Sequence, residues 1–110
     1  MAFDEGLAER VRNLLHDQNN VVEKKMFGGL CFMVSGHMLV GVLKNELMAR
    51  VGPVQYDEYL TKPHARKMDF TGRAMTGMIY VSPEGLQKDP DLKFWIDTCL
   101  SFTSTLTPKS

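Results

Sequence analysis

The stretch from Pro63 to Gly77, PHARKMDFTGRAMTG, is the part of the sequence that says most about the fold. It is too irregular for a helix and too charged for a buried strand, so we expect a basic loop over residues 62–73. Within it, Met68 and Phe70 stand at strand spacing, and glycines allow the backbone to turn. We therefore expect this loop to touch a β-sheet near Met68 and Phe70.

Upstream of this stretch, the hydrophobic pattern predicts one helix and four strands. Apolar residues recur at helical spacing between Phe3 and Leu15, with charged residues on the opposite side, as in an amphipathic helix. Short apolar runs joined by turns such as Gly28-Gly29 and Ser35-Gly36 then predict an antiparallel meander. The expected strands cover residues 21–27, 30–34, 37–43 and 46–51.

The remaining elements follow from proline, glycine and a second apolar stripe. They are a short helix that opens at Gly52-Pro53, a strand over residues 77–82, a turn at 83–85, and a final helix that is N-capped by Asp89 and carries the stripe from Leu92 to Phe102. The order predicts an α+β two-layer sandwich. An antiparallel sheet of about five to six strands carries three helices on one face, in the order α-β-β-β-β-α-β-β-α. We expect one domain over residues 1–110, with a frayed tail at 103–110.

Composition restricts the class of protein. The chain has 110 residues, a formal net charge of zero and 44% hydrophobic residues, as in an ordinary globular domain. It shows neither a basic excess typical of an independent nucleic-acid binder nor a secretory signal, and we expect a cytoplasmic protein without a membrane segment. Cys31 and Cys99 fit no zinc or redox spacing, so we expect two reduced structural thiols and no metal or cofactor.

The predicted strands are apolar on both faces. Along them Leu30, Phe32 and Val34 lie opposite Cys31 and Met33; Met38, Val40 and Val42 lie opposite Leu39 and Leu43; Leu47, Ala49 and Val51 lie opposite Met48 and Arg50. Three helices can cover only one face, so the other should leave an apolar patch. Either the loop at 62–76 folds over this patch, or it is an adaptable surface for a homodimer or a protein partner. Its expected members are Met33, Met48, Met75 and Met78.

The basic loop itself could contact an anion or a nucleic acid. Arg66, Lys67 and Arg73 are the candidate contacts, because guanidinium and ammonium groups bind phosphates. The alternative is that these cations are solvated or pair with Asp57, Glu58 and Asp69. Arg50, expected within a strand, needs a polar partner of its own, and Asp69 or Glu46 could supply it.

No catalytic arrangement is visible in the sequence. His16, His37 and His64 lie on different elements without a metal-ligand spacing. The glycines form neither a nucleotide-binding loop nor a nucleophile elbow. We therefore expect a protein that is not an enzyme. A cryptic site built from Arg50, Tyr56, Arg66 and Asp69 is the alternative.

Three short motifs together identify a family. Met26-Phe27-Gly28-Gly29, Arg50-Val51-Gly52-Pro53 and the 63–77 stretch resemble the N-terminal domain of the TfoX/Sxy family of bacterial competence regulators, over most of the chain from Met26 to Trp95. The resemblance implies helices packed on one face of an antiparallel sheet. It also implies a regulatory module connected with competence and transcription.

Full-length regulators of that family carry a second, C-terminal domain, so we expect here a standalone domain that acts through protein contacts. The first alternative is a weak DNA- or RNA-binding accessory protein that uses the loop at 62–73. The second is a small-ligand sensor, or the cryptic enzyme.

Overall fold

The computed structural model describes residues 3–18, 20–26, 28–70 and 73–106, and the side chains at 69, 70 and 73–75 lie outside that description. Its elements follow the expected order. They are α1 (Glu5–Leu14), β1 (Val21–Met26), β2 (Gly29–Val34), β3 (His37–Leu43), β4 (Glu46–Arg50), α2 (Tyr56–Leu60), β5 (Ala65–Phe70), β6 (Arg73–Val81), the 3₁₀ turn η1 (Pro83–Gly85) and α3 (Asp89–Thr103). The turn expected at 83–85 is confirmed.

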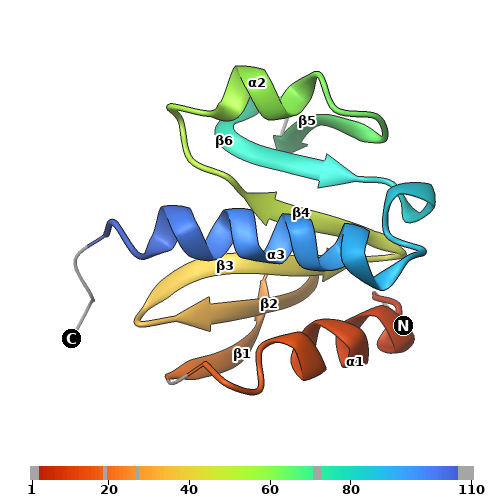
Figure 1. Ribbon diagram of the computed structural model, residues 1–110, viewed down its shortest axis with the longest axis vertical. Coiled ribbons are helices and arrows are strands. Elements are labelled where there is room, and N and C mark those ends of the chain that lie inside the picture. Colours follow the sequence, from red (N-terminus) through yellow and green to blue (C-terminus); the bar gives the residue numbers. More distant parts are fainter. Residues whose placement is uncertain (1–2, 19, 27, 71–72, 107–110) are drawn as a thin grey trace.

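The strands form one antiparallel six-stranded sheet in the order β1-β2-β3-β4-β6-β5. The helices lie on one face of it (Figure 1), where α3 crosses β3 and β4, α1 packs beside α3, and α2 covers β5 and β6. The α+β two-layer sandwich is therefore confirmed. Among the described residues, no helix is both long enough and apolar enough to cross a bilayer.

The main core lies between the helices and the sheet. Leu39, Leu47 and Ile79 from the sheet pack with Leu92 and Ile96 from α3, and all five are essentially inaccessible to solvent. Burying each such side chain contributes about 1.5–3 kcal/mol, so this contact is a substantial part of what stabilises the fold. The apolar stripe expected on the last helix is the one that makes it.

The N-terminal segment is fixed to the sheet before α1 begins. Asp4 caps α1 by accepting a hydrogen bond from the backbone N–H of Leu7 at 3.0 Å. The backbone N–H of Asp4 in turn donates to the carbonyl of Lys44 at 2.5 Å, and Phe3 forms a bridge with Lys44. The turn between β3 and β4 thus positions α1.

The expected basic loop is wrong, because most of it is a hairpin of β5 and β6. Ala65 pairs with Val81 and Lys67 with Ile79, and the register shifts near Met68, whose side chain is fully buried. An edge strand tolerates charged side chains that a central strand does not, because they reach solvent around the open edge. The many charged residues of this stretch therefore led to the wrong prediction of a loop.

Both predicted helix starts are displaced. Asp89 is the first residue of α3 and Lys88 is its N-cap, so the expected Asp89 cap is wrong. The carboxylate of Asp89 accepts instead from the guanidinium of Arg10 at 3.1 Å, which links α3 to α1. The helix expected to open at Gly52-Pro53 begins only at Tyr56, because a bend over residues 53–55 precedes it.

One assignment to a sheet face is also wrong, and a β-bulge is the reason. Phe32 of β2 pairs with Val40, but its neighbour Met33 pairs with Met38, so that Leu39 is left between them. Because the extra residue inverts the alternation, Leu39 joins the helix-side core and Met38 points to the opposite face.

The last helix reaches the first residue of the segment expected to fray, 103–110. Thr103 is the last residue of α3 and is buried, and hydrogen-bonded turns continue to Leu106. Residues 107–110 of the expected tail lie outside the described part of the chain, as does residue 27 of the first expected strand.

The backbone just after β4 is hydrogen-bonded to β6 and packs against the end of α3. Val51 and Gly52 both donate to the carbonyl of Gly77, at 2.9 and 3.2 Å. Gly52 has a φ of 91°, and a Cβ at this position would lie 2.4 Å from Cδ1 of Phe102. Only glycine lets the Phe102 ring sit on this backbone.

We expect Gly52→Ala to destabilise the fold more than Gly28→Ala. Gly28 also has a positive φ, of 80°, but a Cβ there would meet only Leu43 Cδ1 at an ordinary 3.7 Å. The backbone strain of about 1–2 kcal/mol is common to both variants. Overpacking against Phe102 should add about 1–3 kcal/mol for Gly52→Ala alone. Urea unfolding measures the difference, and equal losses would show that the Phe102 contact contributes nothing.

Candidate functional site

Arg66 is engaged within the sheet. Its guanidinium donates two hydrogen bonds to the Glu46 carboxylate, the Nη2–Oε1 contact being 2.7 Å, and it lies 4.7 Å from the Tyr80 ring centroid. The hydrogen bonds that Arg66 donates to the Glu46 carboxylate raise the pKa of Arg66. The cation therefore ties β5 to β4 across β6, and the carboxylate that pairs with it is not one of the three expected.

The other candidate anion contacts are arranged differently. Lys67 is exposed on the edge strand β5. Arg73 opens β6, where its backbone pairs with Phe70, and its side chain lies outside the description. Lys62 lies over the ring of Phe94, with Nζ 5.0 Å from the centroid. Anion binding by Arg66, Lys67 and Arg73 remains a prediction.

Arg50 has neither of its expected partners in view. Glu46 is occupied by Arg66, and the side chain of Asp69 lies outside the described part. Arg50 Nη1 instead donates to the carbonyl of Met38 at 3.4 Å, and its guanidinium lies 5.5 Å from the Phe102 ring centroid. It thus links β4 to β3 and to the end of α3, a structural role.

Sulphur-containing side chains fill the sheet face that the helices leave uncovered. We call the buried ones the sulphur cluster: Cys31, Met38, Met48, Met68 and Met78. Met48 is fully buried and Met78 nearly so. Gly41 makes room for them, because a Cβ there would lie 2.5 Å from Met48 Cε and 3.1 Å from Cys31 Sγ.

The sulphur cluster has a partly buried rim, formed by Met26, Met33, Leu43 and Tyr80. Of the expected interface residues, Met48 and Met78 thus lie inside the cluster, Met33 lies on its rim, and the side chain of Met75 is outside the description. A partner could reach the rim but not the cluster itself. The interface remains a prediction.

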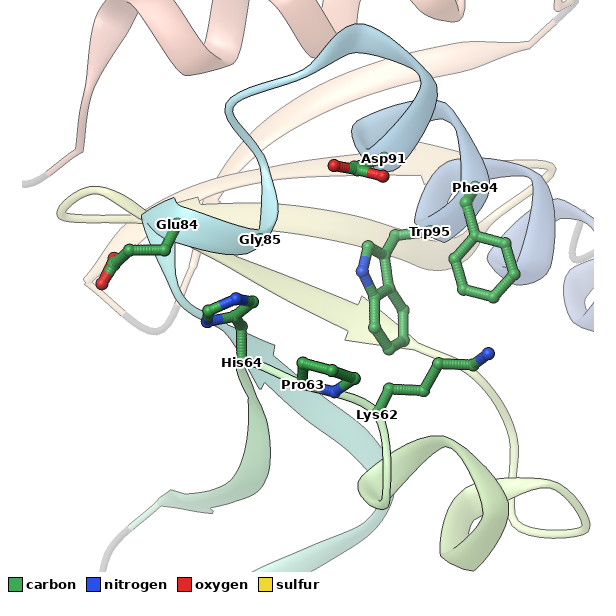
Figure 2. Close-up of a pocket in the computed structure, with 8 residues that line it drawn as sticks. All are labelled: Lys62, Pro63, His64, Glu84, Gly85, Asp91, Phe94 and Trp95. Atoms are coloured by element: carbon green, nitrogen blue, oxygen red, sulfur yellow. The ribbon is translucent and has the colours of Figure 1, made fainter.

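A pocket that the sequence pattern did not indicate lies beside α3. It is lined from the turn before β5 by Lys62 and His64, from η1 by Glu84, and from α3 by Asp91, Phe94 and Trp95. Its volume is about 480 Å³ (Figure 2). Residues 62–64 and residues 84–95, about twenty residues apart in the sequence, both contribute, so no local motif could have shown it.

The pocket has a rigid aromatic wall. Trp95 is only 4% exposed and packs edge to face against both Tyr59 and Phe94, with ring centroids 5.9 and 5.3 Å away. Figure 2 shows the indole nitrogen on the side of the ring that faces His64 and Gly85. No acceptor for this N–H is found among the residues that the structure describes.

The opposite wall is also well defined. His64 has a positive φ of 70°, and its carbonyl accepts from the backbone N–H of Ser82 at 2.9 Å. A Cβ at Gly85 would lie 2.9 Å from the Cβ of His64, so glycine is what allows η1 to approach this residue. Asp91 stands at the rim, whereas the Glu84 carboxylate points outward (Figure 2).

This arrangement is suited to binding. It offers a basic side, an acidic rim and an apolar wall. Within the described ranges, no group of three or more histidine, cysteine or acidic residues could hold a metal ion. Of the residues in the suggested cryptic enzyme site, Arg66 is paired with Glu46 and Arg50 lies against Phe102.

Comparison with protein families gives one result. The family model described as the TfoX N-terminal domain matches residues 13–103, most of the chain. Neither the curated proteins nor the solved structures provide a match.

Both thiols should be unreactive in the native state, because only the thiolate reacts. Burial raises the pKa of Cys31 to about 11 from an ordinary 9.0, and burial also raises the pKa of Cys99. We expect a thiol reagent such as DTNB to label neither thiol at pH 8 until urea unfolds the chain, and then to label both. Prompt labelling of either thiol in buffer would contradict this packing.

The same pKa shift predicts a pH dependence. The unfolded chain loses the Cys31 proton near its ordinary pKa of 9.0, whereas the folded chain keeps it up to about 11. The contribution to stability is complete below pH 9 and falls as the pH rises through this window. Urea unfolding at pH 8 and pH 10.5 should show the loss, and Cys31→Ala should reduce it.

Proposed function

The chain belongs to the TfoX N-terminal domain family, and from that membership we propose that it is a non-enzymatic regulatory module that acts through contacts with proteins. The family match over residues 13–103 is the observation that carries this proposal. It makes the chain a competence-regulator-like domain. In the structure, some polar side chains link secondary-structure elements and others line a pocket. The pocket supports a binding role.

A second copy of the chain is the first partner that we propose. The rim of the sulphur cluster combines Met26, Met33, Leu43 and Tyr80, and next to it Val22 of the edge strand β1 is 52% exposed. Methionine side chains adapt to the opposing surface, and a twofold contact would let each copy cover the same apolar atoms of the other. The exposed members are few, so the contact is expected to be weak.

Light scattering on a dilution series tests this contact. We expect the mass to fall from dimer to monomer on dilution, and Met33→Lys to shift the midpoint at least tenfold upward in concentration, because a rim ammonium would lose water on association. Val54→Lys is the matched control, because Val54 is 95% exposed on the loop after β4. A monomer at every concentration, or an equal effect of both variants, would reject the dimer.

Weak nucleic-acid binding is the second candidate function. The observation in its favour is that Lys67 is exposed on the edge strand β5, near the start of β6 that carries Arg73. Because Arg66 is held by Glu46, this surface offers two candidate cations rather than three. We therefore expect at most a weak, strongly salt-dependent interaction.

Binding of a labelled 20-mer single-stranded DNA at 50–200 mM salt tests that candidate. Lys67→Glu should weaken binding and reduce the salt slope by about one. Lys93→Glu is the control with the same change of charge, because Lys93 lies on α3 and pairs with Asp97. Undetectable binding at the lowest salt, or equal effects of the two variants, would exclude this function.

A further inference from the structure

The indole N–H of Trp95 points to a ligand. Trp95 is 96% buried, yet none of the described residues accepts a hydrogen bond from its N–H, which faces the pocket (Figure 2). A buried tryptophan N–H normally has a partner, because an unsatisfied donor loses the hydrogen bond it would make to water. The indole nitrogen is not one of the fully buried polar atoms without a partner, so it is open to the pocket and can donate to water or to a ligand there.

The charges of the lining restrict what that occupant can be. Lys62 and His64 contribute donors from one side, and Asp91 contributes an acceptor from the rim on α3. A simple anion would meet the Asp91 carboxylate, and a simple cation would meet the Lys62 ammonium. A molecule that carries both charges satisfies both sides of the pocket.

The size and the apolar wall restrict it further. A volume of about 480 Å³ lies within the range of small-molecule pockets and exceeds what a single ion needs. Phe94 is 39% exposed at the mouth, and the Pro63 ring faces the same space (Figure 2). An apolar side chain of the ligand would bury this exposed aromatic surface.

We propose that the pocket between the 62–64 turn, η1 and α3 binds a free α-amino acid with an apolar side chain. Its carboxylate accepts from the N–H of Trp95 and from His64, its ammonium group donates to Asp91, and its side chain packs on Phe94. This inference goes beyond the proposed regulatory function and does not depend on the protein partner. On this proposal, the domain contains a binding site for a small metabolite.

The walls are held in place before the ligand arrives. Tyr59 and Phe94 fix the Trp95 ring, and the hydrogen bond from Ser82 fixes the backbone of His64. Little conformational entropy then remains to be lost on binding, which favours a small ligand with few contacts.

Trp95 is the single tryptophan of the chain, so its fluorescence reports the pocket directly. We expect L-phenylalanine and L-leucine to change the emission, excited at 295 nm, in a saturable way at concentrations up to 10 mM. Three analogues test the recognition of both charges: 3-phenylpropionate, phenethylamine and N-acetyl-L-phenylalanine amide. Each should bind at least tenfold more weakly than L-phenylalanine.

Variants locate the site. Asp91→Asn should weaken L-phenylalanine binding at least fivefold, whereas Asp97→Asn, on the outer side of the same helix and paired with Lys93, should leave it unchanged. Trp95→Phe keeps an aromatic wall but lacks the N–H, and titration calorimetry should show at least a fivefold loss. Gly85→Ala should also weaken binding, because its Cβ displaces His64. Circular dichroism confirms that each variant is folded.

Two results would overturn the proposal. One is the lack of any saturable fluorescence change or heat with the amino acids up to 10 mM. The other is binding of the uncharged amide as tight as that of L-phenylalanine, which would indicate a peptide segment of a protein as the occupant. The light-scattering result on Met33→Lys is independent of both, so this inference and the proposed dimer can fail separately.

Discussion

The structure depends on one constraint: its central strands are apolar on both faces, but its helices cover only one. On the helix side, branched and aromatic side chains from α1, α2 and α3 interlock with those of the sheet and bury its apolar face. The other side is closed by unbranched thioethers packed over Gly41 and around Cys31. Each strand must present suitable side chains to both the helix side and the sulphur side, and the bulge at Leu39 makes this possible in β3. It sends Leu39 toward the helices and Met38 toward the sulphur side.

The charged residues follow from the same constraint. In strands that are otherwise apolar, cationic side chains lie at strand ends and at open sheet edges. There they contact carboxylates, carbonyl groups or aromatic rings. Arg66 lies on Tyr80 and pairs with Glu46, and Arg50 lies against Phe102. In each case the cation fastens neighbouring elements together. Basic residues in this sequence therefore serve first as cross-links between secondary structures.

The sequence was sufficient for the class, the order of elements and the helix-side core, because those depend on local periodicity. It was insufficient where a tertiary contact overrides a local pattern. The hairpin of β5 and β6 looked like a loop because edge exposure, which permits Lys67, is invisible in the sequence. The cap at Asp89 failed because Arg10, 79 residues away, takes its carboxylate. The pocket was missed because Lys62, Glu84 and Trp95 meet only in the folded chain.

The two layers of the fold also differ in their chemistry toward oxidants. Thioethers accept oxygen to become polar sulfoxides, and a sulfoxide in a packed interior disrupts it. On this protein the rim methionines Met26 and Met33 are partly exposed, whereas Met48 and Met68 of the same cluster are inaccessible. An oxidant that approaches the sheet meets the rim first. We therefore expect the outer methionines to be oxidised before the buried ones on which the packing of the strands depends.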